Sequence, residues 1–148
     1  MTLANGILDI DHVMCQVGDT EQAGAAFERL GFSTTPRSSI AAGGVANRLV
    51  ILTPRGDGVA NFIELMAIED RERLEPSMAD ILAGVPGIKS LVNALESADA
   101  ARLAHIASGF SMLDVWPKQR KWRLPSGEEL LVAFRVVIPA PDQVPLMV

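Results

Sequence analysis

The segment DIDHVMCQVGDTEQAGAAFERLGF, residues 9–32, decides the fold that the sequence predicts. In its first part, residues 9–17, successive side chains would point to opposite faces of a β-strand. One face would carry Ile10, His12, Met14 and Gln16. A histidine in the middle of this strand faces either a core or a cavity, and which of the two it faces is central to predicting the function.

The rest of the segment has the spacing of a helix. Asp19 or Thr20 can cap its first N–H groups, and Gly31 is typical of the residue that follows a helix. Four apolar residues form a stripe along this helix: Ala23, Ala26, Phe27 and Leu30. Further strands are expected at 32–39, 45–54 and 59–68, with the turn RGDG joining the last two.

The same order of elements recurs in the second half of the chain. A strand at 87–95 precedes a helix that Ser97 can cap and Gly109 can end, and three strands follow at 111–119, 121–124 and 128–138. Aligning LGF (30–32) with SGF (108–110) gives an offset of 78 residues, which carries His12 onto Ser90. The sequence therefore predicts a β-α-β-β-β unit written twice.

Two such units predict an α+β fold with curved, mixed and antiparallel-rich sheets around a cavity. Each unit has one apolar sheet face that it cannot bury alone, so two units must pair, within one chain or between chains. We expect a single domain over 1–148, organised as a first unit (8–68), a connector (69–86), a second unit (87–137) and an extended tail (138–148). A homodimer is the expected assembly.

Composition narrows the class of protein. With 148 residues, 49% of them hydrophobic, the chain suits one compact domain. The single cysteine, Cys15, excludes an intramolecular disulfide and fits a reducing compartment. The formal charge of −5 argues against nucleic-acid binding. The N-terminus is not typical of a signal peptide, and no apolar run is long enough to span a membrane, so a cytoplasmic protein is expected.

Several stretches resemble the vicinal oxygen chelate superfamily, specifically its glyoxalase-like branch. They are IDHVMCQVGDTEQAGAAFERLGF (10–32), GGVANRLVIL (43–52), NFIELMAI (61–68) and KWRLPSGEELLVAF (121–134). The resemblance covers residues 8–137. It implies a half-open barrel built by each pair of units. In many members of the superfamily the barrel holds a divalent metal that chelates two neighbouring substrate oxygens, whereas other members bind antibiotics without a metal.

The resemblance also implies where metal ligands would lie. In metal-dependent members the ligands come from the first and last strand of each unit, which places His12 and Glu64 in the first unit. An imidazole and a carboxylate suit Zn, Ni, Mn or Fe.

The second unit departs from this pattern. Its third ligand position holds Ser90, or Ile88 if the register slips, and its fourth holds Leu131 or Ala133. Two ligands alone should bind a divalent ion poorly. Glu128 or Glu129 could contribute a ligand only if the last strand were displaced. Pairing of two first units between chains would instead supply four ligands.

Two interpretations of His12 follow. Either it is a neutral histidine that hydrogen-bonds to Glu64 in a polar pocket, or the two residues are metal ligands. In the first case the pair could serve as a general base toward a bound carbon acid, and in the second Glu64 could also be the proton acceptor.

Neighbouring residues are candidates for binding a ligand. Arg48 either pairs with a surface carboxylate or clamps a carboxylate-bearing ligand at the cavity mouth, while Asn47 bonds either the loop backbone or the ligand. Met14, Gln16 and Ser90 are further candidates for binding the ligand. Four residues would form an apolar wall of the cavity or belong to the core: Phe62, Met66, Trp116 and Trp122.

The preferred hypothesis is a small-molecule-binding, glyoxalase-like protein with a degenerate metal site centred on His12 and Glu64. A metal-dependent lyase, isomerase or dioxygenase of the vicinal oxygen chelate type is the alternative, and a scaffold without a ligand is a third hypothesis. The sequence does not name the ligand.

Overall fold

The computed structural model describes residues 6–40, 43–52, 61–123 and 127–140. The predicted RGDG turn, residues 55–58, lies outside these ranges. The chain divides into two compact units, one formed by Asp9–Ala94 and the other by Met1–Leu8 together with Leu95–Val148. The strand that begins the second sequence repeat therefore belongs to the same compact unit as the first repeat.

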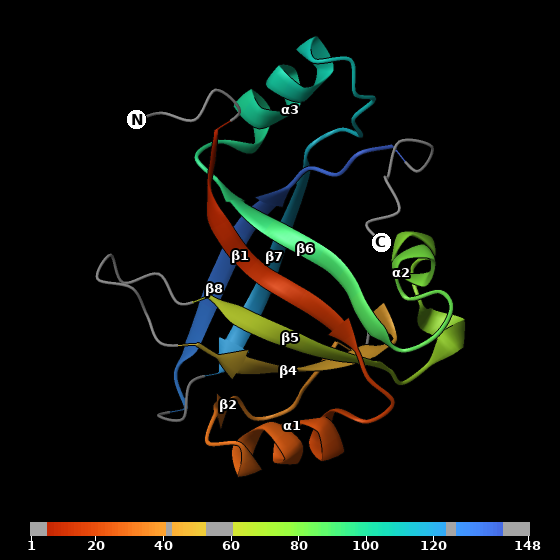
Figure 1. The fold of residues 1–148 in the computed structure, drawn as a ribbon, viewed down its shortest axis with the longest axis vertical. Helices are drawn as coiled ribbons and strands as arrows, with labels where there is room; N and C mark the ends of the chain where they lie inside the picture. The colour runs from red at the N-terminus through yellow and green to blue at the C-terminus, as the bar shows by residue number, and fades with distance from the viewer. Residues whose placement is uncertain (1–5, 41–42, 53–60, 124–126, 141–148) are drawn as a thin grey trace. The chain divides into compact units, whose positions relative to one another are not determined.

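The unit Asp9–Ala94 is built on a six-stranded mixed sheet. Its elements are β1 (Ile7–Gln16), α1 (Thr20–Arg29), β2 (Ser33–Thr34), β3 (Ser38–Ile40), β4 (Val45–Ile51), β5 (Phe62–Ile68), η2 (Arg71–Arg73), α2 (Pro76–Ile81) and β6 (Gly87–Leu95). The strand order is β2-β4-β5-β1-β6, and β3 pairs with β4 beside β2. Figure 1 shows β4, β5, β1 and β6 side by side. Strands β1 and β5 are parallel, whereas β4 is antiparallel to β2, β3 and β5.

Helix α1 begins and ends where the sequence predicts. The Asp19 carboxylate accepts hydrogen bonds from the backbone N–H groups of Glu21 (2.7 Å) and Gln22 (3.0 Å). Gly31 follows the helix with φ +90°, a conformation that favours glycine.

The predicted apolar stripe of α1 is only partly buried: Ala23, Ala26 and Phe27 are half-buried. Leu30 is 74% exposed, and the buried residues of the helix are Thr20 and Gly24. A Cβ atom on Gly24 would lie 2.7 Å from Arg48 Nη1, so the helix depends on a glycine to fit over this side chain. The closest approach of the helix to Arg48 is therefore made through a glycine.

The opposite face of the sheet carries an apolar cluster. Met14, Val45, Met66 and Leu82 form its buried part. Half-buried side chains from β3, β5, α2 and the residue at 74 pack against them: Ile40, Ile68, Leu74, Met78 and Ile81. The two faces of the sheet thus have different neighbours: α1 on one face and the segment around α2 on the other.

The predicted strand at 32–39 is two short strands, β2 and β3, on either side of Pro36. Proline lacks the N–H group that a continuous strand would use in pairing, so the break falls at the residue expected to end pairing.

The second compact unit contains α3 (Ala98–Ala107), β7 (Trp116–Arg123) and β8 (Glu129–Val136). The Ser97 hydroxyl caps α3 by accepting a hydrogen bond from the Ala100 N–H group at 3.3 Å. The prediction of separate strands at 111–119 and 121–124 is wrong: β7 pairs with β8 without interruption from Trp116 to Arg123. An isolated bridge joins Met112 to Pro139.

The predicted α+β class with curved, mixed sheets is confirmed, and the sheet is not closed. Within the described ranges, no helix combines the length and the apolar character needed to cross a membrane.

Candidate functional site

Buried polar side chains gather on the sheet face that faces away from α1. Because paired residues on neighbouring strands point to the same face, the register places Met14, Glu64 and Leu49 in one row across β1, β5 and β4. The rows on either side contain the remaining members of the group. We call these four residues the polar group: Gln16, His12, Asn47 and Glu64.

Glu64 is at the centre of the polar group. It is 7% exposed and is flanked by apolar neighbours, so its carboxylate needs hydrogen-bond donors to be stable there. Asn47, which is 1% exposed, supplies one: its Nδ2 atom donates to Glu64 Oε1 at 2.6 Å. Asn47 thus bonds a buried carboxylate, not the loop backbone considered from sequence.

The second carboxylate oxygen of Glu64 faces His12. The distance between His12 Nε2 and Glu64 Oε2 is 3.5 Å, longer than a good hydrogen bond. The structure therefore brings together the two residues that the sequence places at the centre of the site, but leaves their facing atoms apart.

The imidazole of His12 is held on two further sides. Its ring stacks on Phe62, with centroids 4.6 Å apart and planes inclined by 10°, because His12 and Phe62 are register partners on adjacent strands. Its Nδ1 atom lies 2.5 Å from Asp11 Oδ1. The side chain of His12 is only 16% exposed, so the ring has one well-defined orientation with Nε2 toward Glu64.

Sequence reasoning missed Asp11. Strict alternation assigns Asp11 and His12 to opposite faces of β1, so a contact between their side chains was not expected. The only signal in the sequence is the presence of an acidic residue next to the histidine.

His12 and Glu64 fit part of a metal site. Two donors bound to one ion at about 2.1 Å lie about 3.4 Å apart in a tetrahedral arrangement, close to the 3.5 Å between Nε2 and Oε2. Asn47 and Asp11 contact the outer sides of the two donors, as hydrogen-bond partners of metal ligands commonly do.

The residues predicted at the other ligand positions do not complete the set. Leu131 and Ala133 lie on β8 and have no donor atom in their side chains, while Ser90 is half-buried on β6, the neighbour of β1. Ile88 is 78% exposed. Within the described part of the chain, no cluster of three or more His, Cys, Asp or Glu side chains is suited to hold a metal.

Arg48 is not a member of the polar group. It pairs in register with Leu65, so it points to the face covered by α1. There its guanidinium donates to Thr35 O (2.8 Å), Glu21 Oε2 (2.8 Å), Glu28 Oε1 (2.9 Å) and Thr34 Oγ1 (2.6 Å). Of the two roles considered from sequence, the structure shows the first: Arg48 pairs with carboxylates. In this orientation its guanidinium does not reach a ligand beside His12.

The other candidate ligand-binding residues divide into three kinds. Met14 and Met66 belong to the apolar cluster beside the polar group. Gln16 is 8% exposed, and its buried Oε1 atom has no hydrogen-bond partner among the residues that the structure describes. Trp122 lies on β7, but its side chain falls outside the described part of the structure.

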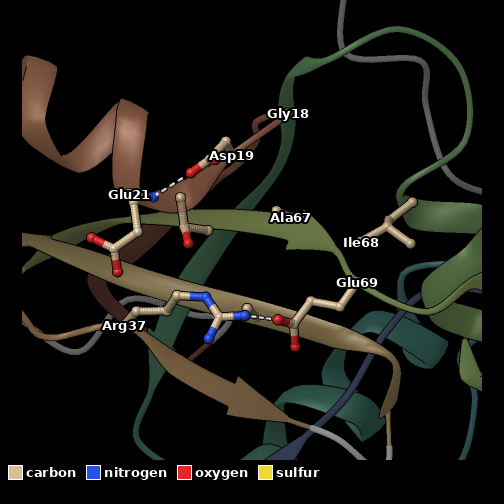
Figure 2. Close-up of a pocket in the computed structure, with 9 residues that line it drawn as sticks. Gly18, Asp19, Glu21, Arg37, Ala67, Ile68 and Glu69 are labelled. Carbon is tan, nitrogen blue, oxygen red and sulfur yellow. Dashed lines mark hydrogen bonds and ion pairs between the residues drawn. The ribbon is translucent and has the colours of Figure 1, made fainter.

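A hollow of about 210 Å³ lies on the α1 side of the sheet. Figure 2 shows Arg37 and Glu69 joined across it, with Asp19 and Glu21 at its rim. Asp19 caps α1, and Glu21 binds Arg48, so these charged groups already have partners in the fold. The hollow is a weaker candidate for a site than the polar group.

The sequence matches the family of glyoxalase-like domains over residues 10–147. The chain belongs to this family. The glyoxalase-like domain places it in the vicinal oxygen chelate superfamily, and the resemblance found in the sequence is confirmed.

Solved structures agree on the fold of this glyoxalase-like protein. A Streptomyces coelicolor methylmalonyl-CoA epimerase, in complex with 2-nitronate-propionyl-CoA, is 17% identical with a TM-score of 0.66, covering 93% of this chain and 90% of that chain. The epimerase from Mycobacterium tuberculosis is 20% identical with a TM-score of 0.59, and the match covers 96% and 95% of the two chains. A comparison with curated proteins finds no match.

Proposed function

We propose that this glyoxalase-like protein binds a small molecule on the sheet face that carries the polar group. The observation that supports this most is the state of Glu64: one oxygen is held by Asn47, while the other faces His12 at 3.5 Å. A buried network that is held in place but incompletely bonded is costly for a structural core and useful for a ligand.

The charges around the polar group indicate the kind of ligand end that enters. Asp11 and Glu64 flank the imidazole, and the guanidinium of Arg48 points to the other face of the sheet. Glu64 Oε2 and Gln16 Oε1 are both acceptors with capacity to spare. The ligand therefore presents a hydroxyl, an N–H group, an acidic C–H group or a cation to this face, with an apolar part against Met14 and Phe62.

Isothermal titration calorimetry with propionyl-CoA, which has no carboxylate on its acyl group, and separately with CoA alone, tests this proposal. Acyl-CoA esters are the first probes because the epimerases of similar fold are described with them. Binding by wild-type protein that falls at least about tenfold in His12→Ala supports the site. His105→Gln is the matched control, since it removes the other histidine of the chain. Binding that is equal in His12→Ala would contradict the assignment.

A metal-dependent isomerase or lyase is the second candidate function. The spacing of His12 Nε2 and Glu64 Oε2 favours it, because 3.5 Å suits two ligands of one ion better than it suits a hydrogen bond. His12 and Glu64 would hold the ion, and Asp11 and Asn47 would keep these two side chains oriented. A bound divalent ion supplies Lewis acidity toward neighbouring substrate oxygens.

Metal content per chain separates the two candidates. Untagged protein is dialysed against trace Mn, Fe, Ni and Zn and measured by plasma mass spectrometry, with His12→Ala and Glu64→Gln alongside. Near-stoichiometric metal that is lost in both variants would favour the enzyme, and epimerisation of methylmalonyl-CoA would be assayed next. Equal, low metal in all three proteins would favour binding without a metal, as only two protein donors are expected to hold an ion weakly.

We also propose that the protein forms a homodimer. The β7–β8 hairpin exposes apolar side chains on both faces in one subunit: Trp116 (41%) and Phe134 (43%) on one face and Leu131 (63%) on the other. Light scattering after size exclusion should give the mass of two chains, and Leu131→Lys should shift it toward one chain. A wild-type mass of one chain would contradict this proposal. A cytoplasmic location stays a prediction from the sequence.

A further inference from the structure

The imidazole of His12 lies between two carboxylates. Nδ1 is 2.5 Å from Asp11 Oδ1, and Nε2 is 3.5 Å from Glu64 Oε2. A neutral imidazole carries one N–H group, so it can donate to only one of these two oxygens. Which nitrogen carries the proton decides what the ring offers to a ligand.

The distances favour Asp11 as the acceptor. The Nδ1 to Asp11 Oδ1 distance of 2.5 Å is close enough for a hydrogen bond, whereas 3.5 Å is beyond the usual range for N–H···O bonds. We propose that Asp11 is a positioning residue that accepts the Nδ1–H of His12 and thereby leaves the Nε2 lone pair directed at Glu64.

Other contacts restrict rotation of the His12 ring and of the Glu64 carboxylate. Phe62 stacks on the imidazole at 4.6 Å and fixes its plane. Asn47 holds Glu64 Oε1 at 2.6 Å and restricts rotation of the carboxylate. Turning the ring by 180° would point carbon atoms at both carboxylates and lose the contact with Asp11. The tautomer is therefore set by Asp11 rather than by free rotation of His12.

The consequence for the polar group is specific. With the proton on Nδ1, Nε2 and Glu64 Oε2 become two acceptors 3.5 Å apart that face one gap. Such a gap binds a shared cation or a ligand hydroxyl or N–H group, and it repels a ligand carboxylate. The consequence for ligand binding rests on the proposed function, whereas the tautomer of His12 is a property of the ligand-free protein.

Nitrogen-15 NMR of the imidazole side chains tests the proposal. The chain has only two histidines, so His105→Gln leaves the signals of His12 alone. Spectra are recorded at about pH 9, where imidazoles are generally neutral, because the two tautomers then give different shifts for the two ring nitrogens. Wild-type His12 should have the proton on Nδ1 with a preference of about tenfold or more, as expected for a hydrogen bond to an ionised acceptor.

Variants on the two sides of the ring should act in opposite ways. Asp11→Ala removes the acceptor of Nδ1–H, so the proton should move to Nε2, where Glu64 is the remaining carboxylate. Glu64→Gln should leave the proton on Nδ1. Asp80→Asn, which removes an exposed carboxylate from α2, is the control and should leave the tautomer unchanged. Asp11→Asn is measured in parallel, and it should weaken the preference while preserving the shape of the side chain.

Three results would overturn the proposal: a proton on Nε2 in the wild type, an unchanged tautomer in both Asp11 variants, or protons on both ring nitrogens at about pH 9. Circular dichroism checks that each variant is folded, and Asp11 is 40% exposed, so its replacement should be tolerated. Because the spectra contain no ligand or metal, a failure here is distinguishable from a failure of the binding experiments.

Discussion

The two faces of the β4-β5-β1 region differ in how completely their buried polar groups are hydrogen-bonded. On the α1 face, the guanidinium of Arg48 reaches four acceptors within 2.9 Å. On the other face, His12 Nε2 and Glu64 Oε2 lie 3.5 Å apart, and Gln16 Oε1 has no hydrogen-bond partner within the described part of the chain. A saturated network stabilises the fold, whereas an unsaturated one is a candidate for binding. This difference directs attention to the His12 face, although Arg48 has the more conspicuous charge.

The largest effect is expected from removing Arg48. Its side chain is 11% exposed, and Arg48→Ala removes the bonds to Thr34, Thr35 and two glutamates together with the packing of α1. We expect the free energy of unfolding to fall by about 2–4 kcal/mol. The loss is not larger because the two exposed glutamates can be hydrated once their partner is gone. Urea unfolding measures it, with Arg48→Lys as a variant of intermediate effect. A loss below about 0.5 kcal/mol would place this network among surface ion pairs.

The next effect concerns the hydrogen bond between Asn47 and Glu64. Asn47→Leu removes the donor and leaves a buried carboxylate oxygen unpaired, which should cost about 2 kcal/mol of unfolding free energy. The double variant Asn47→Leu with Glu64→Leu should recover at least half of this loss, because both polar groups are then absent. If the double variant loses as much as the sum of the single variants, the two side chains are not coupled.

Gly24→Ala tests the close approach of α1 to Arg48. Alanine normally stabilises a helix interior by about 1 kcal/mol relative to glycine. Here its Cβ atom would meet Nη1, Cζ and Nε of Arg48 within 2.9 Å, so we expect a loss of about 1 kcal/mol instead. In the Arg48→Ala background the same change should become stabilising. If Gly24→Ala stabilises the wild type, the guanidinium moves freely.

The smallest effect is expected for the partners of Arg48. Glu21 and Glu28 are 61% and 48% exposed at their side chains, so water screens their ion pairs. Glu21→Gln and Glu28→Gln should each lower the free energy of unfolding by about 0.5 kcal/mol, and the loss should shrink in 1 M salt, roughly an ionic strength at which exposed pairs are screened. A loss as large as that of Arg48→Ala would show that the charges, not the buried arginine, stabilise this face.

Periodicity predicted much of the fold. The strand β6 spans Gly87–Leu95, the range predicted from the sequence, and Asp19, Ser97 and Gly31 are at the ends of helices as expected. The predicted boundary between strands at 111–119 and 121–124 is wrong. The charged residues around Arg120 continue the pairing of β7 with β8 instead of forming a turn.

Periodicity also explains part of what was missed at the site. Neighbouring residues in a strand point to opposite faces, so Asn47 and Arg48 cannot both enter one cavity, although they were considered together. Alternation also argued against a contact that the structure has: the side chain of Asp11 reaches His12, although the two residues are neighbours in sequence. The burial of Gly24 follows from the position of Arg48, which a helical stripe does not reveal.

A matched pair of variants tests the central comparison most directly. Gln16→Met and Arg48→Met place the same apolar side chain on the two faces of the sheet, and urea unfolding measures both. The account predicts opposite signs: Gln16→Met raises the free energy of unfolding by about 1 kcal/mol, because an unpaired buried oxygen is removed, and Arg48→Met lowers it by about 2 kcal/mol or more. A loss of stability in both variants would mean that the polar groups of the His12 face belong to the structural core.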